Sequence, residues 1–118
     1  MSVLLVEDDF LVAAALSESL AGADLSVEVA HTDRDAYNFL KDPERSFSVL
    51  VTDIDLGPGT DGFDVARAAR AAHPGIPVIY ITGHASHQSH LGVEGSVMMA
   101  KPFSPQELTL RVKQLALH

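Results

Sequence analysis

The chain has 118 residues, of which 47% are apolar and none is cysteine, and its formal net charge is −8. This length and composition predict one globular domain over residues 1–118, and the lack of cysteine excludes disulfides and cysteine-ligated metals. No apolar run approaches the roughly 18 residues of a membrane span, so we expect a cytoplasmic protein without membrane contact. Residues 1–64 hold 14 acidic and 3 basic residues, which argues against nucleic-acid binding and suits a divalent-cation site, although an acidic surface is ordinary in itself.

Short apolar runs alternate with longer helical patterns along the first half of the chain. Residues 2–6 predict an apolar strand, and residues 10–21 a helix with apolar positions four residues apart. Residues 26–30 predict a second strand, which is more polar and is therefore placed at a sheet edge. Thr32 can cap a helix that continues to about Leu40. Residues 47–52 predict a third, strongly apolar strand.

The second half continues the same alternation. A helix is predicted from Asp61 or Gly62 to Ala72, then strands at residues 77–82 and 97–100 with a short polar segment between them. Ser104 to Glu107 form a capping box with proline at the first helical position, which starts a last helix. Five strands alternating with helical segments predict an α/β fold, in which a parallel sheet has helices on both faces.

Polar residues stand where four of the predicted strands end: Glu7 and Asp8, Asp53, Thr82 and Lys101. In parallel α/β sheets, reactive groups gather at the carboxyl ends of the strands. Three carboxylates crowded together repel one another, so a cation must neutralise them or some must be protonated. Oxygen ligands of this kind suit Mg²⁺. A carboxylate beside a metal, an ammonium and a hydroxyl is arranged for phosphoryl transfer, with the carboxylate as nucleophile.

These residues lie in five short motifs: Val-Glu-Asp-Asp (6–9), Val-Thr-Asp-Ile-Asp-Leu (51–56), Asp-Gly (61–62), Ile-Thr-Gly (81–83) and Lys-Pro-Phe (101–103). In this order, over nearly the whole chain, they resemble the receiver domain of response regulators. The resemblance implies a flavodoxin-like (βα)5 doubly wound sheet with strand order 2-1-3-4-5. It also implies a two-component phosphorelay, in which a histidine kinase or histidine phosphotransfer protein supplies the phosphoryl group.

The resemblance assigns roles to single residues. Asp53 would accept the phosphoryl group, and the domain would catalyse its own phosphorylation and dephosphorylation without being an enzyme in the usual sense. Asp8 and Asp53 would ligate Mg²⁺, Glu7 would act largely through water, and the backbone carbonyl of Asp55 would complete the ligands. Thr82 and Lys101 would contact the phosphoryl group, and the Lys101–Pro102 peptide would be cis.

Phosphorylation is then expected to switch a protein-interaction surface made of residues 83–96, the strand 97–100 and the last helix. The downstream partner is unknown, no output domain is expected within these 118 residues, and a monomer or weak dimer is predicted. Leu110 and Leu117, seven residues apart on the last helix, fit a partner surface and ordinary surface exposure equally well.

Three features depart from the common receiver pattern. The loop after Asp53, residues 57–60, is one residue longer. Met98 stands where receivers usually carry the aromatic rotamer switch, three residues before the lysine. Only 18 residues separate Thr82 from Lys101, so the fourth helix is expected to be short or irregular. The segment Tyr-Ile-Thr-Gly-His (80–84) is similar to that of the FAT-GUY receivers, which work with HWE-type and related histidine kinases.

Parts of the sequence are compatible with other functions. Asp53-Ile54-Asp55 also resembles the nucleophile motif of Mg²⁺-dependent haloacid-dehalogenase-type phosphatases, but that class places the motif near the N-terminus and needs a longer chain. A binding module that is never phosphorylated is disfavoured by the intact set of Asp53, Thr82 and Lys101. His84, His87 and His90 recur every three residues, which is compatible with a transition-metal site or with a loop. His84 could also reach the phosphoryl pocket and tune the attack of water.

Overall fold

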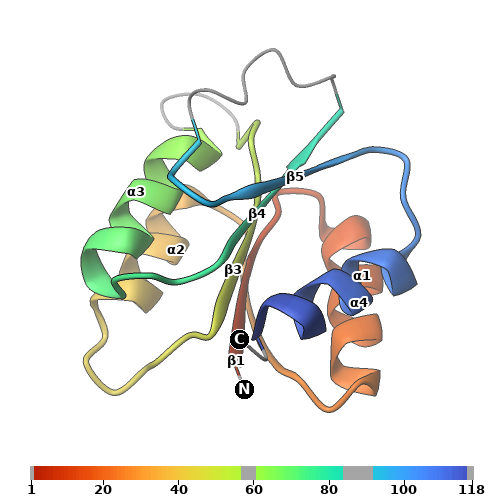
Figure 1. The fold of residues 1–118 in the computed structure, drawn as a ribbon, viewed down its shortest axis with the longest axis horizontal. Coiled ribbons are helices and arrows are strands. Elements are labelled where there is room, and N and C mark those ends of the chain that lie inside the picture. Colours follow the sequence, from red (N-terminus) through yellow and green to blue (C-terminus); the bar gives the residue numbers. More distant parts are fainter. Residues whose placement is uncertain (1, 57–60, 84–91, 117–118) are drawn as a thin grey trace.

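The computed structural model describes residues 2–56, 61–83 and 92–116. Five parallel strands form one sheet in the order β2-β1-β3-β4-β5 (Figure 1), which confirms the predicted strand order. The strands are β1 (Ser2–Val6), β2 (Ser26–Ala30), β3 (Val49–Asp53), β4 (Val78–Thr82) and β5 (Val97–Ala100). The polar strand β2 lies at one edge, as its sequence predicted, and β5 lies at the other.

Four helices in the described ranges cover the two faces of the sheet. Helices α1 (Phe10–Gly22) and α4 (Pro105–Ala116) lie on one face, and α2 (Asp33–Lys41) and α3 (Gly62–Ala72) on the other (Figure 1). The predicted short or irregular fourth helix falls mainly on residues 84–91, which lie outside the described residues. None of the described helices has the length and apolarity needed to cross a membrane.

Side-chain caps fix where the helices begin. The carboxylate of Asp9 accepts hydrogen bonds from the first turn of α1, and Thr32 and Asp61 do the same for α2 and α3. At α4 the predicted capping box is confirmed, since the Glu107 amide donates to the Ser104 hydroxyl at 3.2 Å and the Ser104 amide donates to the Glu107 carboxylate at 3.5 Å. Three of these caps closely follow a strand, so the strand ends and helix starts meet at one edge of the sheet.

The core consists of two apolar layers, one on each side of the sheet. Alternate residues of each strand point to opposite faces, so successive side chains enter different layers. The layer under α2 and α3 contains Leu4, Val6, Leu50 and Tyr80 from the sheet. The layer under α1 and α4 contains Val3, Leu5, Val49, Val51, Ile79 and Ile81 from the sheet, with Leu16, Leu20, Leu108 and Val112 from the helices.

Two strand boundaries differ from the predicted ones. The third strand begins at Val49 and includes Asp53, whereas the sequence predicted residues 47–52. Phe47 is buried in the layer under α2 and α3, so it is apolar because it packs in the core and not because it pairs in the sheet. The fourth strand begins at Val78, one residue after the predicted start at Pro77, which has no amide proton for the ladder.

Candidate functional site

The strand register brings the predicted site residues to one edge of the sheet. Val6 pairs with Thr52, Asp53 with Ile81, and Thr82 with Ala100. Glu7 therefore follows β1 beside the end of β3, Asp53 is the last residue of β3, and Lys101 follows β5. This is the carboxyl edge of the parallel strands, where α/β folds place their reactive groups.

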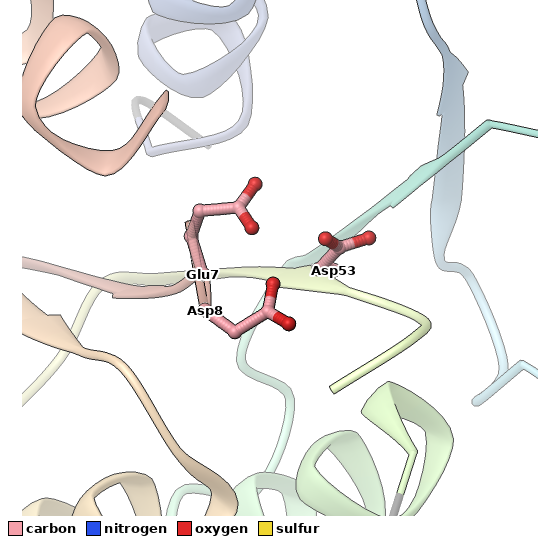
Figure 2. Close-up of side chains that lie close together, drawn as sticks. All are labelled: Glu7, Asp8 and Asp53. Atoms are coloured by element: carbon pink, nitrogen blue, oxygen red, sulfur yellow. The ribbon is translucent and has the colours of Figure 1, made fainter. Parts of the chain in front are cut away.

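Three carboxylates form a cluster at this edge. Glu7, Asp8 and Asp53 each offer a carboxylate oxygen, and these oxygens lie within 4.8 Å of one another (Figure 2). Glu7 is 1% exposed and Asp53 is 6% exposed, whereas Asp8 is exposed to solvent. The cluster is thus closed on the protein side and open beside Asp8.

Burial and mutual repulsion make these groups reluctant to ionise together. Burial, followed by the nearby carboxylate of Asp53, raises the pKa of Glu7 from 4.5 to about 8. Burial also raises the pKa of Asp53, against the opposing effects of a hydrogen bond with Glu7 and the charge of Lys101. Without a cation, the pair therefore retains a proton at neutral pH.

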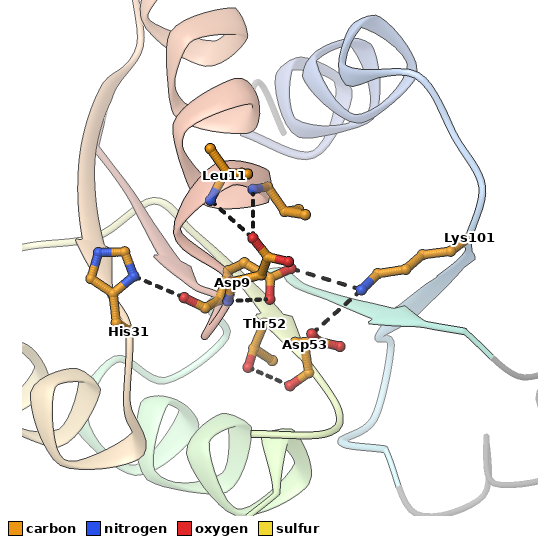
Figure 3. Close-up of polar contacts among 8 residues, drawn as sticks. Asp9, Leu11, His31, Thr52, Asp53 and Lys101 are labelled. Carbon is orange, nitrogen blue, oxygen red and sulfur yellow. Dashed lines mark hydrogen bonds and ion pairs between the residues drawn. The ribbon is translucent and has the colours of Figure 1, made fainter. Parts of the chain in front are cut away.

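Lys101 supplies the positive charge that the sequence predicted for this site. Its Nζ lies 3.5 Å from Asp53 Oδ2 and 3.9 Å from Glu7 Oε1 (Figure 3). Its amide donates to the carbonyl of Thr82 at 2.8 Å, which fixes the start of the β5–α4 connection. The Lys101–Pro102 peptide is cis, which confirms that prediction.

The donor set fits a hard divalent cation. Glu7 Oε1 is buried and accepts no hydrogen bond from the described residues, so one carboxylate oxygen of the cluster is left for a cation to bind. Mg²⁺ is bound through oxygen ligands, usually one or two carboxylates together with water. Asp55, whose carbonyl was predicted as a further ligand, is exposed and forms an isolated bridge with Asp61 just beyond β3.

The other predicted residues are placed as follows. Thr82 is 6% exposed at the end of β4. Met98 lies on β5 opposite Tyr80 of β4 and packs against the layer under α2 and α3. His84, His87, His90 and the loop 57–60 lie outside the described residues. Leu110 is 60% exposed, as its position predicted.

Two residues that the sequence did not single out touch the site. His31 Nδ1 lies 3.0 Å from the carbonyl oxygen of Glu7, within hydrogen-bond distance (Figure 3). Gly62, noted only as part of a motif, packs so closely on β3 that an added Cβ would meet the Asp53 carbonyl oxygen at 2.2 Å. Both contacts join residues from different elements, so no local sequence pattern predicts them.

Comparison with known proteins places this geometry in a family. The sequence model of the response regulator receiver domain matches residues 3–113. The transcriptional regulatory protein CreB of Escherichia coli K12 is 32% identical over 117 residues, which are 97% of this chain and 50% of CreB. The chain therefore spans about half of the length of that relative.

Solved structures agree with this match. The crystal structure of a response regulator receiver protein from Sinorhizobium medicae WSM419 has a TM-score of 0.92 and 31% identity, covering 99% of this chain and 94% of that chain. The chemotaxis protein CheY4 of Vibrio cholerae has a TM-score of 0.85 and 26% identity, covering 97% of both chains. The likeness extends over the whole sheet and its helices.

Proposed function

Because this chain belongs to the response regulator receiver domain family of two-component signalling, we propose that Asp53 is its phosphoryl acceptor. The observation that carries the proposal is the position of the Asp53 carboxylate within the acidic cluster and beside the ammonium of Lys101. Lys101 Nζ lies 3.5 Å from its Oδ2, and one carboxylate oxygen each of Glu7, Asp8 and Asp53 lie within 4.8 Å of one another. The haloacid-dehalogenase-type alternative is not supported, since both the family match and the fold are those of receivers.

The chemistry is transfer of a phosphoryl group from a phosphohistidine donor. A carboxylate oxygen of Asp53 forms a bond to phosphorus, the bond between phosphorus and the donor imidazole breaks, and the imidazole leaves with the electron pair of that bond. Asp8, Asp53 and the carbonyl of Asp55 would hold Mg²⁺, with Glu7 acting largely through water, and the metal would supply positive charge that offsets the charge on the phosphoryl oxygens. Lys101 and the hydroxyl of Thr82 bind the same oxygens from the β4–β5 side.

The same groups serve the return reaction. Water attacks the phosphorus of the aspartyl phosphate, the bond to the Asp53 oxygen breaks, and inorganic phosphate leaves. The domain thus catalyses its own phosphorylation and dephosphorylation. Tuning of this hydrolysis by His84 remains a prediction from the sequence.

We assign the phosphoryl donor to the class of histidine kinases or histidine phosphotransfer proteins. For this domain itself we propose a cytoplasmic location, no nucleic-acid contact, and a monomer or weak dimer. The similarity of residues 80–84 to the FAT-GUY receivers supports HWE-type and related kinases as the first candidates. Family membership supports the donor class and the location, and the acidic first half of the chain argues against nucleic-acid contact. The oligomeric state stays a prediction.

The output is a protein-interaction surface made of residues 83–96, β5 and α4. Its described part is tied to the strand that carries Thr82. The amide of Val93 donates to the hydroxyl of Tyr80 at 3.0 Å, and Tyr80 lies two residues before Thr82 on β4. Movement of Thr82 toward a phosphoryl group would therefore reach Val93 through one strand and one hydrogen bond.

Intact-mass analysis after incubation with acetyl phosphate tests the acceptor. The wild-type chain should gain one phosphoryl mass in the presence of Mg²⁺ and none in its absence, and Asp53→Asn should gain none. Asp24→Asn is the matched control, because Asp24 is exposed and has a positive φ of 65° that asparagine adopts readily. Labelling of Asp53→Asn at the wild-type level would refute the assignment.

A further inference from the structure

The segment from Glu7 to Phe10 leaves the sheet between β1 and α1, and it carries two of the three clustered carboxylates. The Glu7 amide still bonds in the ladder, since it donates to the carbonyl of Ala30 at 2.9 Å. In a parallel ladder the Glu7 carbonyl would next accept from a backbone amide beyond β2. The chain instead turns into α2 there, with Thr32 as its cap, and the Nδ1 of His31 lies 3.0 Å from the Glu7 carbonyl.

The His31 ring also contacts the far end of this segment. The ring of Phe10 stacks on it, with centroids 4.0 Å apart and planes inclined by 28°. Phe10 is 69% exposed, so its ring is held on the imidazole and not in the core. One side chain after β2 thus touches both Glu7 and Phe10, the two ends of the segment that contains Asp8.

We propose that His31 is a positioning residue for the divalent-cation site. Its Nδ1–H donates to the Glu7 carbonyl and its face packs on Phe10, so that Glu7 and Asp8 are held close to Asp53 although carboxylates repel one another when they ionise. His31 follows one edge strand of the sheet and Lys101 follows the other, so the cluster is supported from both edges (Figure 3). The inference rests on the proposed function, because it takes Glu7, Asp8 and Asp53 as the cation site.

The expected effect is on affinity for the cation. Loss of a partner that orients a metal ligand typically weakens binding 10- to 100-fold; because His31 acts through the backbone of Glu7, we expect a loss of about threefold to tenfold. His31→Phe keeps a ring to stack on Phe10 but removes the donor. His31→Asn restores a donor at about the position of Nδ1 but cannot stack on Phe10, so its affinity should fall only about twofold to threefold. Phe10→Ala removes the stacking partner and should weaken binding about twofold to threefold.

Isothermal titration of Mg²⁺ into each metal-free variant, together with its melting temperature, tests the proposal. His73→Asn is the matched histidine control, since His73 follows the far end of α3 beside Phe47. Weaker binding in His31→Phe with recovery in His31→Asn supports the positioning role. Equal Mg²⁺ affinity in all variants, even with lowered melting temperatures, would show that His31 is merely structural and would overturn it.

The same titrations separate this inference from the proposed function. If the wild type binds no Mg²⁺, the cation site itself is wrong and the role of His31 is refuted with it. If the wild type binds Mg²⁺ and His31→Phe binds equally well, only the role of His31 is refuted. Should His31→Phe fail to fold, Phe10→Ala carries the test because its side chain is exposed, and an unchanged affinity there counts against the proposal.

Discussion

Gly62 lies so close to the backbone carbonyl of Asp53 that a Cβ at position 62 would lie 2.2 Å from the carbonyl oxygen. The Gly62 amide also donates to the carbonyl of Ile54 at 2.8 Å. The first residue of α3 is therefore docked on the end of β3, beside the proposed phosphoryl acceptor. The missing side chain at position 62 is what permits this contact.

Gly62→Ala should consequently destabilise the fold and impair phosphorylation together. A Cβ forced into a packed site costs about 1–3 kcal/mol, and relief of the clash requires movement of Asp53 or of α3. Gly22→Ala is the control, because a Cβ at the end of α1 has open space and should be neutral or slightly stabilising. Urea unfolding and acetyl-phosphate labelling measure the two effects. Wild-type stability in Gly62→Ala would show that the contact is not tight.

The Asp8 carboxylate offers a second test of the cation site. Asp8→Ala should reduce the rise in melting temperature that Mg²⁺ causes in the wild type, because the cation then binds more weakly to the folded state. Without metal the variant should be as stable as the wild type or more so, since the negative charge of Asp8 beside the other two carboxyl groups is gone. Scanning calorimetry with EDTA and with excess Mg²⁺ measures both. A wild-type Mg²⁺ response in the variant would remove Asp8 from the ligands.

The site was predictable where it depends on strand ends, and unpredictable where it depends on contacts between elements. Asp53 and Lys101 follow apolar runs that could be identified as strands, and parallel strands bring their carboxyl ends to one edge. His31 and Gly62 act through approaches to Glu7 and Asp53 that no local pattern encodes. Phe47 shows the same limit in the fold, because burial in the core and pairing in a strand both favour an apolar residue.

The raised pKa of Glu7 predicts how stability depends on pH without metal. The unfolded chain loses this proton near the ordinary pKa of 4.5, whereas the folded chain keeps it up to about 8. The folded state then binds more protons between these values, so stability should fall as pH rises from about 5 to about 8. The raised pKa of Asp53 acts in the same direction, although the charge of Lys101 partly opposes the rise at Asp53.

Urea unfolding in EDTA between pH 5 and 8.5 measures this dependence. Glu7→Gln should lose much of the decline, and comparison with the wild type separates Glu7 from the six histidines of the chain, which titrate in the same window. Mg²⁺ displaces the shared proton, so its affinity should increase with pH over the same range. An identical pH slope in Glu7→Gln and wild type would contradict the assignment of the proton to this cluster.

The last prediction concerns how phosphorylation reaches the output surface. We expect it to order residues 83–96, as Thr82 is drawn to the phosphoryl oxygens and Gly83 follows. The described residues supply a link, since the Val93 amide donates to the Tyr80 hydroxyl on the strand that carries Thr82. Tyr80 is fully buried, and its ring packs 4.9 Å from that of Phe63 at the start of α3. The phosphoryl group can shift the equilibrium toward the ordered state only if it contacts the two states differently, and a contact with Thr82 made in the ordered state would supply that difference.

Hydrogen exchange with and without beryllofluoride, which mimics the phosphoryl group, measures this ordering. The largest new protection should lie between Gly83 and Val97 in the wild type, and Asp53→Asn should show none. Tyr80→Phe keeps the buried ring but removes the acceptor of the Val93 amide, at a cost of about 1 kcal/mol, so exchange at Val93 should be faster and the gain in protection smaller. If Tyr80→Phe gains as much protection as the wild type, the hydrogen bond does not transmit the signal. If α4 gains more protection than residues 83–97, the output lies on α4 and the ordering mechanism is wrong.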